Sequence, residues 1–357
     1  MKELVSQWQA VHPEGFQGID IQWREPNFSL RPVPPLLPVV TSDSFGVPFP
    51  IHWLFGSGKH AHTPVSVWLN ADGEVESLEH RLSWYPDHGW GETLGLDSSD
   101  QNRGVGFQPA GQAGSLPHGG LESLGKIHDP AATRECFGCH TTYLPLKNGG
   151  RDFDWARIVP GVSCERCHVH GDRHARAMTD GSEATLLERW SALTPLESVN
   201  RCGECHRRAD HFTPDELVPE NDRLIRFASV GLVQSQCFLK QRDWPFDGRT
   251  QATVGAREPA RLLPAAGLVF DDASLPGSAR RLDCITCHDP HRPAESDPAF
   301  YVQRCANCHD AGVGGDAPPC SSPTKQSNCL PCHMPKVEVQ KPLKFTDHWI
   351  RKRGSGQ

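Results

Sequence analysis

The chain has 357 residues, of which 37% are hydrophobic, and it contains 33 glycines and 31 prolines. This composition is poor material for one large core of side chains. The net charge of −7 is modest, and the lysines and arginines do not gather into a stripe interleaved with aromatic residues, which argues against a nucleic-acid partner. No stretch approaches the ~18 apolar residues of a membrane span, so we expect no transmembrane segment.

The part of the chain before the first cysteine contains three recognisable patterns. Arg31–Pro38 is rich in proline and predicts an extended, polyproline-like arm. Val65–Leu69 and Val75–Trp84 alternate apolar and polar residues on either side of Asn70–Gly73, which predicts a β-hairpin. Residues 91–125 are rich in glycine and serine and are expected to form a loop.

The pattern Cys-x-x-Cys-His then occurs six times, as motif 1 (Cys136, Cys139, His140), motif 2 (Cys164, Cys167, His168), motif 3 (Cys202, Cys205, His206), motif 4 (Cys284, Cys287, His288), motif 5 (Cys305, Cys308, His309) and motif 6 (Cys329, Cys332, His333). Two thiols at this spacing attach covalently to one haem, and the adjacent imidazole is the proximal ligand of its iron. Zinc sites and redox dithiols also use Cys-x-x-Cys, but neither requires a histidine after every pair. The sequence therefore predicts six haem c groups.

Three further segments separate the motifs. Ser182–Leu193 has a helical pattern, and Leu224–Cys237 is expected to form another element. Residues 241–281 are rich in proline, glycine and arginine, which is typical of an inserted loop. The two cysteines outside the motifs, Cys237 and Cys320, are candidates for a disulfide in an oxidising compartment; the alternative is two unrelated buried thiols.

These patterns predict a chain in three parts. Residues 1–130 form a region without haem attachment, containing the proline-rich arm, the hairpin and a loop with distal ligands. Residues 131–350 form a hexahaem domain with an insertion at about 241–281, and residues 351–357 form a tail. The expected fold class is a multihaem cytochrome c: low regular secondary structure, short α-helices and long loops around a packed haem array, with a small β-hairpin element in the N-terminal region. Apolar porphyrin faces then replace part of the side-chain core.

Histidine is in surplus and methionine is scarce. Thirteen of the 19 histidines lie outside the motifs, whereas the chain has only three methionines. Histidine–methionine ligation raises haem potentials, so this composition favours low-potential irons with two histidine ligands. The candidate distal ligands are His60, His174, His291 and His348, with His128 and His62 as further candidates; for each, the alternative is a surface or hydrogen-bonded histidine.

The motifs also indicate a compartment. Covalent haem attachment takes place outside the bacterial cytoplasmic membrane, so we expect a periplasmic or extracellular protein. Residues from Met1 onward show no apolar signal region. Either the signal is absent from this numbering or the chain is an incomplete version of a longer product.

The motifs and their surroundings resemble the exported multihaem c-type cytochromes related to the tetrahaem cytochrome of ammonia-oxidising bacteria, in an environmental-bacterial branch. The similar stretches cover about residues 51–350 and are Gly56–Thr63, Glu135–His140, Gly161–His168 with His174, Cys202–Arg207, Leu282–His291 and Asn328–Pro335. The resemblance implies that His60, His174 and His291 are distal ligands. Relatives often begin with one more motif, which this chain lacks; His12 or His52 is then an alternative ligand for a haem elsewhere.

The expected function is electron transfer along a chain of closely packed haems, because an iron with two histidine ligands has no open position for a substrate. One alternative is a multihaem oxidoreductase that acts on a small nitrogen or sulfur oxyanion at a five-coordinate haem. Another is a haem-bearing subunit of a filament or of a membrane-associated respiratory complex. The expected partners are redox proteins, including other multihaem cytochromes.

Overall fold

The structure is a computed structural model that describes residues 19–21, 28–31, 39–42, 45–56, 59–96, 121–168, 171–181, 190, 193–240, 282–309 and 328–352. The chain divides into two compact units. Unit 1 comprises Met1–Arg189 and Gln340–Leu343, and unit 2 comprises Trp190–Val339 and Lys344–Gln357. Motifs 1 and 2 thus belong to unit 1 and motifs 3 to 6 to unit 2. The predicted boundary at residue 130 marks where haem attachment begins along the chain, which the compact units do not test, so it stays a prediction.

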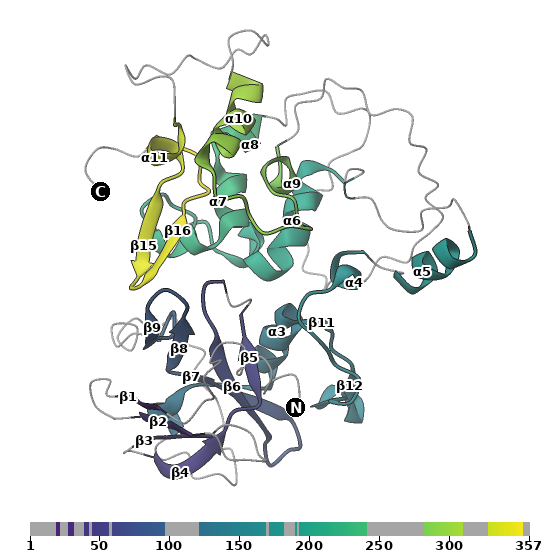
Figure 1. Cartoon of the computed structure of the whole chain (residues 1–357), viewed down its shortest axis with the longest axis vertical. Coiled ribbons are helices and arrows are strands. Elements are labelled where there is room, and N and C mark those ends of the chain that lie inside the picture. The colour runs from purple at the N-terminus through teal and green to yellow at the C-terminus, as the bar shows by residue number, and fades with distance from the viewer. Residues whose placement is uncertain are drawn as a thin grey trace. The chain divides into compact units, whose positions relative to one another are not determined.

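Unit 1 contains two four-stranded antiparallel sheets (Figure 1). The first is a meander of β1 (Ile19–Ile21), β2 (Phe28–Arg31), β3 (Val39–Ser42) and β4 (Phe45–Pro50). The second has the order β10-β7-β6-β5, with β5 at Trp53–Phe55, β6 at Thr63–Leu69, β7 at Val75–His80 and β10 at Gly125–His128. A separate ribbon pairs β8 (Leu82–Tyr85) with β9 (Gly89–Glu92). The N-terminal region therefore contains more sheet than the small hairpin that the sequence predicts.

The predicted β-hairpin is confirmed in β6 and β7, which pair antiparallel. The side-chain oxygen of Asn70 accepts hydrogen bonds from the backbone N–H groups of Asp72 and Glu74, at 3.0 and 2.9 Å. This Asx turn starts the chain reversal. Gly73 completes it with a φ of +74°, a conformation that glycine adopts without steric cost.

The second strand of this hairpin is shorter than predicted. β7 ends at His80, although the expected strand continues to Trp84. The backbone N–H of Arg81 donates to the carbonyl of Leu124 at 2.7 Å, and the chain then enters β8, whose strand partner is β9. Trp84, the last residue of the predicted strand, still forms one antiparallel bridge with His62, directly before β6. Because the apolar alternation continues through the break, the pattern alone does not locate it.

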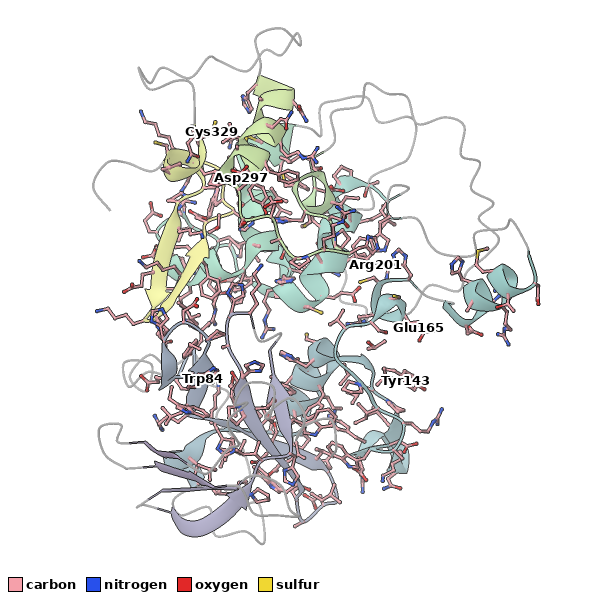
Figure 2. The ribbon with its side chains drawn as sticks, in the orientation of Figure 1. Trp84, Tyr143, Glu165, Arg201, Asp297 and Cys329 are labelled. Carbon is pink, nitrogen blue, oxygen red and sulfur yellow. The ribbon has the colours of Figure 1, made fainter. Side chains whose placement is uncertain are left out.

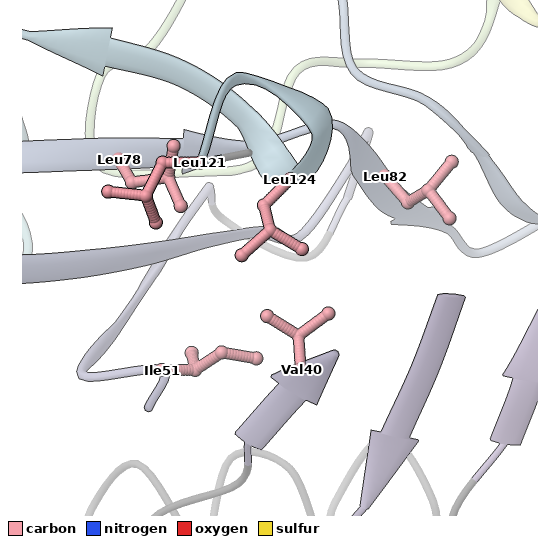
Figure 3. Packing of buried hydrophobic residues seen from close by; sticks show 6 residues of the cluster. All are labelled: Val40, Ile51, Leu78, Leu82, Leu121 and Leu124. Atoms are coloured by element: carbon pink, nitrogen blue, oxygen red, sulfur yellow. The ribbon is translucent and has the colours of Figure 1, made fainter. Parts of the chain in front are cut away.

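The glycine- and serine-rich segment is also only partly a loop. Residues 97–120 lie outside the described residues, as do residues 32–38 of the predicted proline-rich arm. Gly91–Glu92, however, belong to β9, Leu121–Leu124 form the helical turn α2 and Gly125 begins β10, so the predicted loop is wrong at both ends. The two leucines of α2 lie on one face of the turn and join a buried cluster (Figure 3) of Val40, Ile51, Leu78, Leu82, Leu121 and Leu124.

The remaining elements of unit 1 include the two helices that carry the cysteines of motifs 1 and 2. Its helices are α3 (Pro130–His140), α4 (Cys164–Cys167) and α5 (Gly171–Thr179). Two short ribbons pair β11 (Thr141–Tyr143) with β14 (Val159–Pro160) and β12 (Leu146–Lys147) with β13 (Asp152–Phe153), and η2 (Asn148–Gly150) follows β12. A second buried cluster joins Val75, Phe137 and Phe153, so α3 is packed directly against the central sheet.

Unit 2 is mainly helical in the residues described. Its helical elements are α6 (Pro195–His206), η4 (Ala209–His211), η5 (Asp222–Arg226), α7 (Ala228–Gln234), α8 (Gln236–Lys240), α9 (Cys284–Cys287), α10 (Pro298–His309) and α11 (Leu330–His333). A two-stranded sheet pairs β15 (Lys336–Gln340) with β16 (Leu343–Thr346), and residues 340–343 at its turn belong to unit 1. Its buried cluster contains Val199, Leu232, Val233 and Phe238. Segment 224–237 is helical, while most of 182–193 and all of 241–281 lie outside the described residues.

Candidate haem-attachment sites

All six motifs occupy the same local position, the end of a helix (Figure 1). Motifs 1, 3 and 5 end the longer helices α3, α6 and α10, whereas motifs 2, 4 and 6 form the single turns α4, α9 and α11. Side chains three residues apart lie on one face of a helical turn. In each motif whose two cysteine side chains are described, both thiols therefore lie on one side of the helix end, and the histidine follows directly in the chain.

The thiols are accessible to a ligand. Each motif cysteine whose side chain is described is half-buried or exposed; Figure 2 shows Cys329 at the start of motif 6. Among the described residues, no three His, Cys, Asp or Glu side chains gather into a metal site. The donor set of each motif, two thiols and one imidazole, fits covalent haem attachment with one axial ligand from the chain.

Motif 1 is positioned by packing inside unit 1. Helix α3 begins at its N-cap Asp129, whose carboxylate accepts from the backbone N–H of Ala132 at 2.8 Å. Phe137, the residue between the first cysteine and the glycine of the motif, is 0% exposed. Its ring lies 5.2 Å from that of Trp53 and 5.1 Å from that of Phe55, both edge to face. The sheet therefore fixes the helix turn that carries the two thiols.

The proximal histidine of motif 1 is oriented by an aromatic ring. His140 stacks on Phe55, with ring centres 4.1 Å apart and planes 3° from parallel. Neighbouring groups desolvate the imidazole and lower the pKa of His140, while the negative charge of Glu79 raises it by a smaller amount. Part of the residue is still exposed to solvent. Lowering the pKa favours the neutral imidazole, which is the form that binds metal.

Motifs 3 and 4 lie side by side in unit 2. The thiols of Cys202 and Cys284 are hydrogen-bonded to each other, which lowers the pKa of Cys202 and raises that of Cys284. Burial lowers the pKa of both proximal histidines, His206 and His288, and His206 lowers that of His288 further. Two of the six predicted haem sites are therefore neighbours, although 82 residues separate their first cysteines in the sequence.

In two predicted distal ligands, His348 and His291, one ring nitrogen is hydrogen-bonded to an oxygen, as is usual for histidines that bind a metal through the other nitrogen. Nδ1 of His348 donates to the carbonyl of Thr346 at 2.9 Å, and Nδ1 of His291 lies 3.1 Å from the carboxylate of Asp289. Because these oxygens only accept, Nδ1 carries the proton and Nε2 keeps its lone pair. The side chain of His291 is 72% exposed, whereas His348 is half-buried.

His60 and His62 belong to the loop that follows β5. Gly56 opens this loop with a φ of +110°, and a Cβ there would lie 2.1 Å from the carbonyl oxygen of Ala61, so the loop closes only with glycine. His60 is exposed and His62 half-buried. The loop begins next to Phe55, the residue that stacks on His140, which places its start beside motif 1.

The remaining histidines differ in the state of their ring nitrogens. Nε2 of His128 lies 3.2 Å from the carboxylate of Glu79, so in this conformation it donates a proton there instead of a lone pair to iron. Nδ1 of His52 accepts from the backbone N–H of Val67 at 3.1 Å, which leaves Nε2 protonated. His174 is half-buried on α5, and its Nδ1 is buried with no hydrogen-bond partner among the described residues.

Sequence reasoning missed a cavity of about 200 Å³ next to motif 3. Its lining includes three arginines and one carboxylate, together with two aromatic rings: Arg207, Arg223, Arg226, Glu216, Phe212 and Phe227. Guanidinium groups favour an anionic ligand. Arg207 directly follows the proximal histidine of motif 3 and has a φ of +64°. No regular spacing of the arginines in the sequence signals this site.

Paired thiols followed by an imidazole are the attachment pattern of c-type haem proteins. Residues 119–169 match the family model of cytochrome c554 and c-prime. The matched segment contains motifs 1 and 2 and supports a c-type cytochrome, an electron-transfer protein with covalently bound haem. The comparisons with curated proteins and with solved structures gave no match. In the part of the chain that the structure describes, no helix is long and apolar enough to cross a membrane.

Proposed function

We propose that the protein transfers electrons through six covalently bound haem c groups, most of them with two histidine ligands. One observation carries this proposal: all six motifs adopt the same helix-end position, although their helices differ in length and belong to different units. A repeated sequence pattern with a repeated local geometry indicates a repeated chemical task. The surplus of histidines supplies the second ligands.

The chain's own residues hold and tune the cofactors. The cysteines attach haem, Phe55 orients His140, and burial favours the neutral, metal-binding form of His206 and His288. The contact between Cys202 and Cys284 brings the attachment points of motifs 3 and 4 together. When bound, haem iron changes between its ferric and ferrous states and exchanges electrons with neighbouring haems.

The proposal includes an exported protein that acts outside the cytoplasmic membrane, where covalent haem attachment takes place. Its partners are then redox proteins of the periplasm or the cell exterior. A subunit role in a filament or a respiratory complex is compatible with the same chemistry. Light scattering after size-exclusion chromatography, at several protein concentrations, distinguishes a monomeric carrier from an assembly.

The ligand state of the irons tests the proposal. We expect the electron paramagnetic resonance spectrum of the fully oxidised protein to be dominated by low-spin ferric signals. Stepwise reduction followed by visible spectroscopy is expected to show potentials in the low range typical of irons with two histidine ligands. A spectrum dominated by high-spin iron would contradict the proposal.

The arginine-lined cavity favours the second candidate function, an oxidoreductase for a small nitrogen or sulfur oxyanion. Three guanidinium groups next to motif 3 suit an anionic substrate. This function needs one open iron, so it predicts a high-spin signal from one haem that shifts when the anion is added. Absence of that signal in the oxidised protein would leave the cavity without a catalytic role.

A further inference from the structure

His288 and His348 lie at the spacing expected for two ligands of one iron. Their ring centres are 6.3 Å apart, with the planes inclined at 40°. A metal–imidazole bond is about 2 Å long and the ring centre lies about 1 Å beyond the nitrogen, so imidazoles on opposite sides of one metal have centres about 6 Å apart. We infer that His348 is the distal ligand of the iron held at motif 4. This inference rests on the proposed function and assigns one of its ligand pairs.

The hydrogen bond of His348 prepares the correct nitrogen. The carbonyl of Thr346, two residues earlier, accepts the Nδ1 proton at 2.9 Å. Nε2, on the opposite side of the ring, is then the nitrogen with a lone pair, and the ring cannot rotate without losing this bond. A backbone carbonyl is a common partner of metal-binding histidines.

The backbone on both sides of His348 is fixed. The preceding residue, Asp347, is 2% exposed, and its carboxylate accepts from the backbone N–H of Trp349 at 2.9 Å. The same carboxylate pairs with Arg351 at 3.5 Å. The guanidinium of Arg351 lies over the ring of Trp349 and also donates to the carbonyl of Pro219 at 2.9 Å. These contacts hold the backbone that carries the imidazole in place.

Helix α7 packs closely against the backbone of His348 and Trp349. A Cβ at Gly231 would lie 2.7 Å from the backbone nitrogen of Trp349 and 2.9 Å from the carbonyl carbon of His348. Only glycine allows the ligand-bearing backbone to approach this closely. Gly231 is thus a positioning residue for His348.

His348→Ala tests the assignment directly. We expect six haems per chain by pyridine haemochrome assay, as in the wild type, and one additional high-spin ferric haem by electron paramagnetic resonance. Added imidazole should return that haem to the low-spin state. The matched control is His88→Ala, because His88 is exposed and belongs to no predicted site. An unchanged spin state in His348→Ala would overturn the inference.

Removing individual attachment sites identifies the iron. Cys284→Ser with Cys287→Ser deletes the haem of motif 4, so adding His348→Ala to this background should produce no new high-spin haem. The same addition in Cys202→Ser with Cys205→Ser, which deletes the haem of motif 3, should still produce one. The reverse pattern would overturn the assignment to motif 4.

Two milder variants keep the test decisive if His348→Ala does not mature. His348→Met retains a ligand and should raise the reduction potential of one haem, because methionine ligation favours ferrous iron. Gly231→Ala should produce a partial high-spin signal that imidazole removes, whereas Gln234→Ala on the same helix should not. Six low-spin haems in all of these variants would overturn the inference but not the proposed function. A wild-type protein with four haems or fewer would contradict the proposed function itself.

Discussion

At the scale of single residues, a buried histidine shows how the surroundings select a protonation state. The hydroxyl of Ser66 donates to the carbonyl of Pro50 at 2.5 Å, so it accepts from Nε2 of His80, 2.7 Å away. His80 is 4% exposed. Desolvation, with a smaller effect of His52, lowers its pKa to about 3. The central sheet of unit 1 therefore holds a histidine that is neutral when folded.

This histidine makes the stability of unit 1 depend on pH. Its folded-state pKa of about 3 lies below the ordinary value of 6.5, so between these values the unfolded chain binds more protons. Its contribution to stability is complete above pH 6.5 and is lost as the pH falls towards 3. The slope of the unfolding free energy against pH measures how many protons bind on unfolding. We expect His80→Gln to lower that number, between pH 6 and 4, by up to about one.

Denaturant unfolding at several pH values, followed by tryptophan fluorescence, measures this slope. His88→Gln is the control, because His88 is exposed. Equal slopes for the wild type and His80→Gln would contradict the account of this buried site.

Single residues also show what the sequence can predict about the candidate site. The cysteines and proximal histidines follow from the sequence because one helical turn contains all the groups that their chemistry needs. Distal ligands depend on contacts between distant segments. His128, for example, is bonded to Glu79 from a neighbouring strand, and nothing in the sequence around either residue reveals that bond.

At the scale of elements, the loop after β5 depends on one glycine. Gly56 and Gly73 both have a positive φ, but a Cβ at Gly56 would meet the Ala61 carbonyl at 2.1 Å, whereas a Cβ at Gly73 would meet nothing within 4 Å. We expect Gly56→Ala to destabilise unit 1 by roughly 1–3 kcal/mol and Gly73→Ala by about 1 kcal/mol or less. Thermal unfolding of both variants makes the comparison, and equal losses would contradict the close contact.

The elements also show where local patterns stop being informative. Alternation predicts the hairpin of β6 and β7 because a turn between neighbouring strands is a local feature. It does not predict the end of β7, where a hydrogen bond from Arg81 to Leu124 redirects the chain. It also misses α2, since its two buried leucines become recognisable only once the sheet beneath them exists.

At the scale of the whole molecule, the haem motifs do not mark the boundary between the compact units. The absence of cysteine before Cys136 suggests a division near residue 130. In the structure, Phe137 of motif 1 packs with Val75 and Phe153, so the first attachment site shares a core with the N-terminal sheet. The boundary between the compact units follows Arg189, whereas the predicted boundary at residue 130 marks only where haem attachment begins and stays a prediction. Composition shows where haem attaches but not which segments share a core.

The haem content of the purified protein tests the central claim most directly. Intact mass spectrometry counts the groups that remain attached after denaturation, and the pyridine haemochrome assay counts haem c in the same sample. The six helix-end motifs predict a mass increase of six haems and a matching haemochrome value. A chain carrying four haems or fewer would contradict the account.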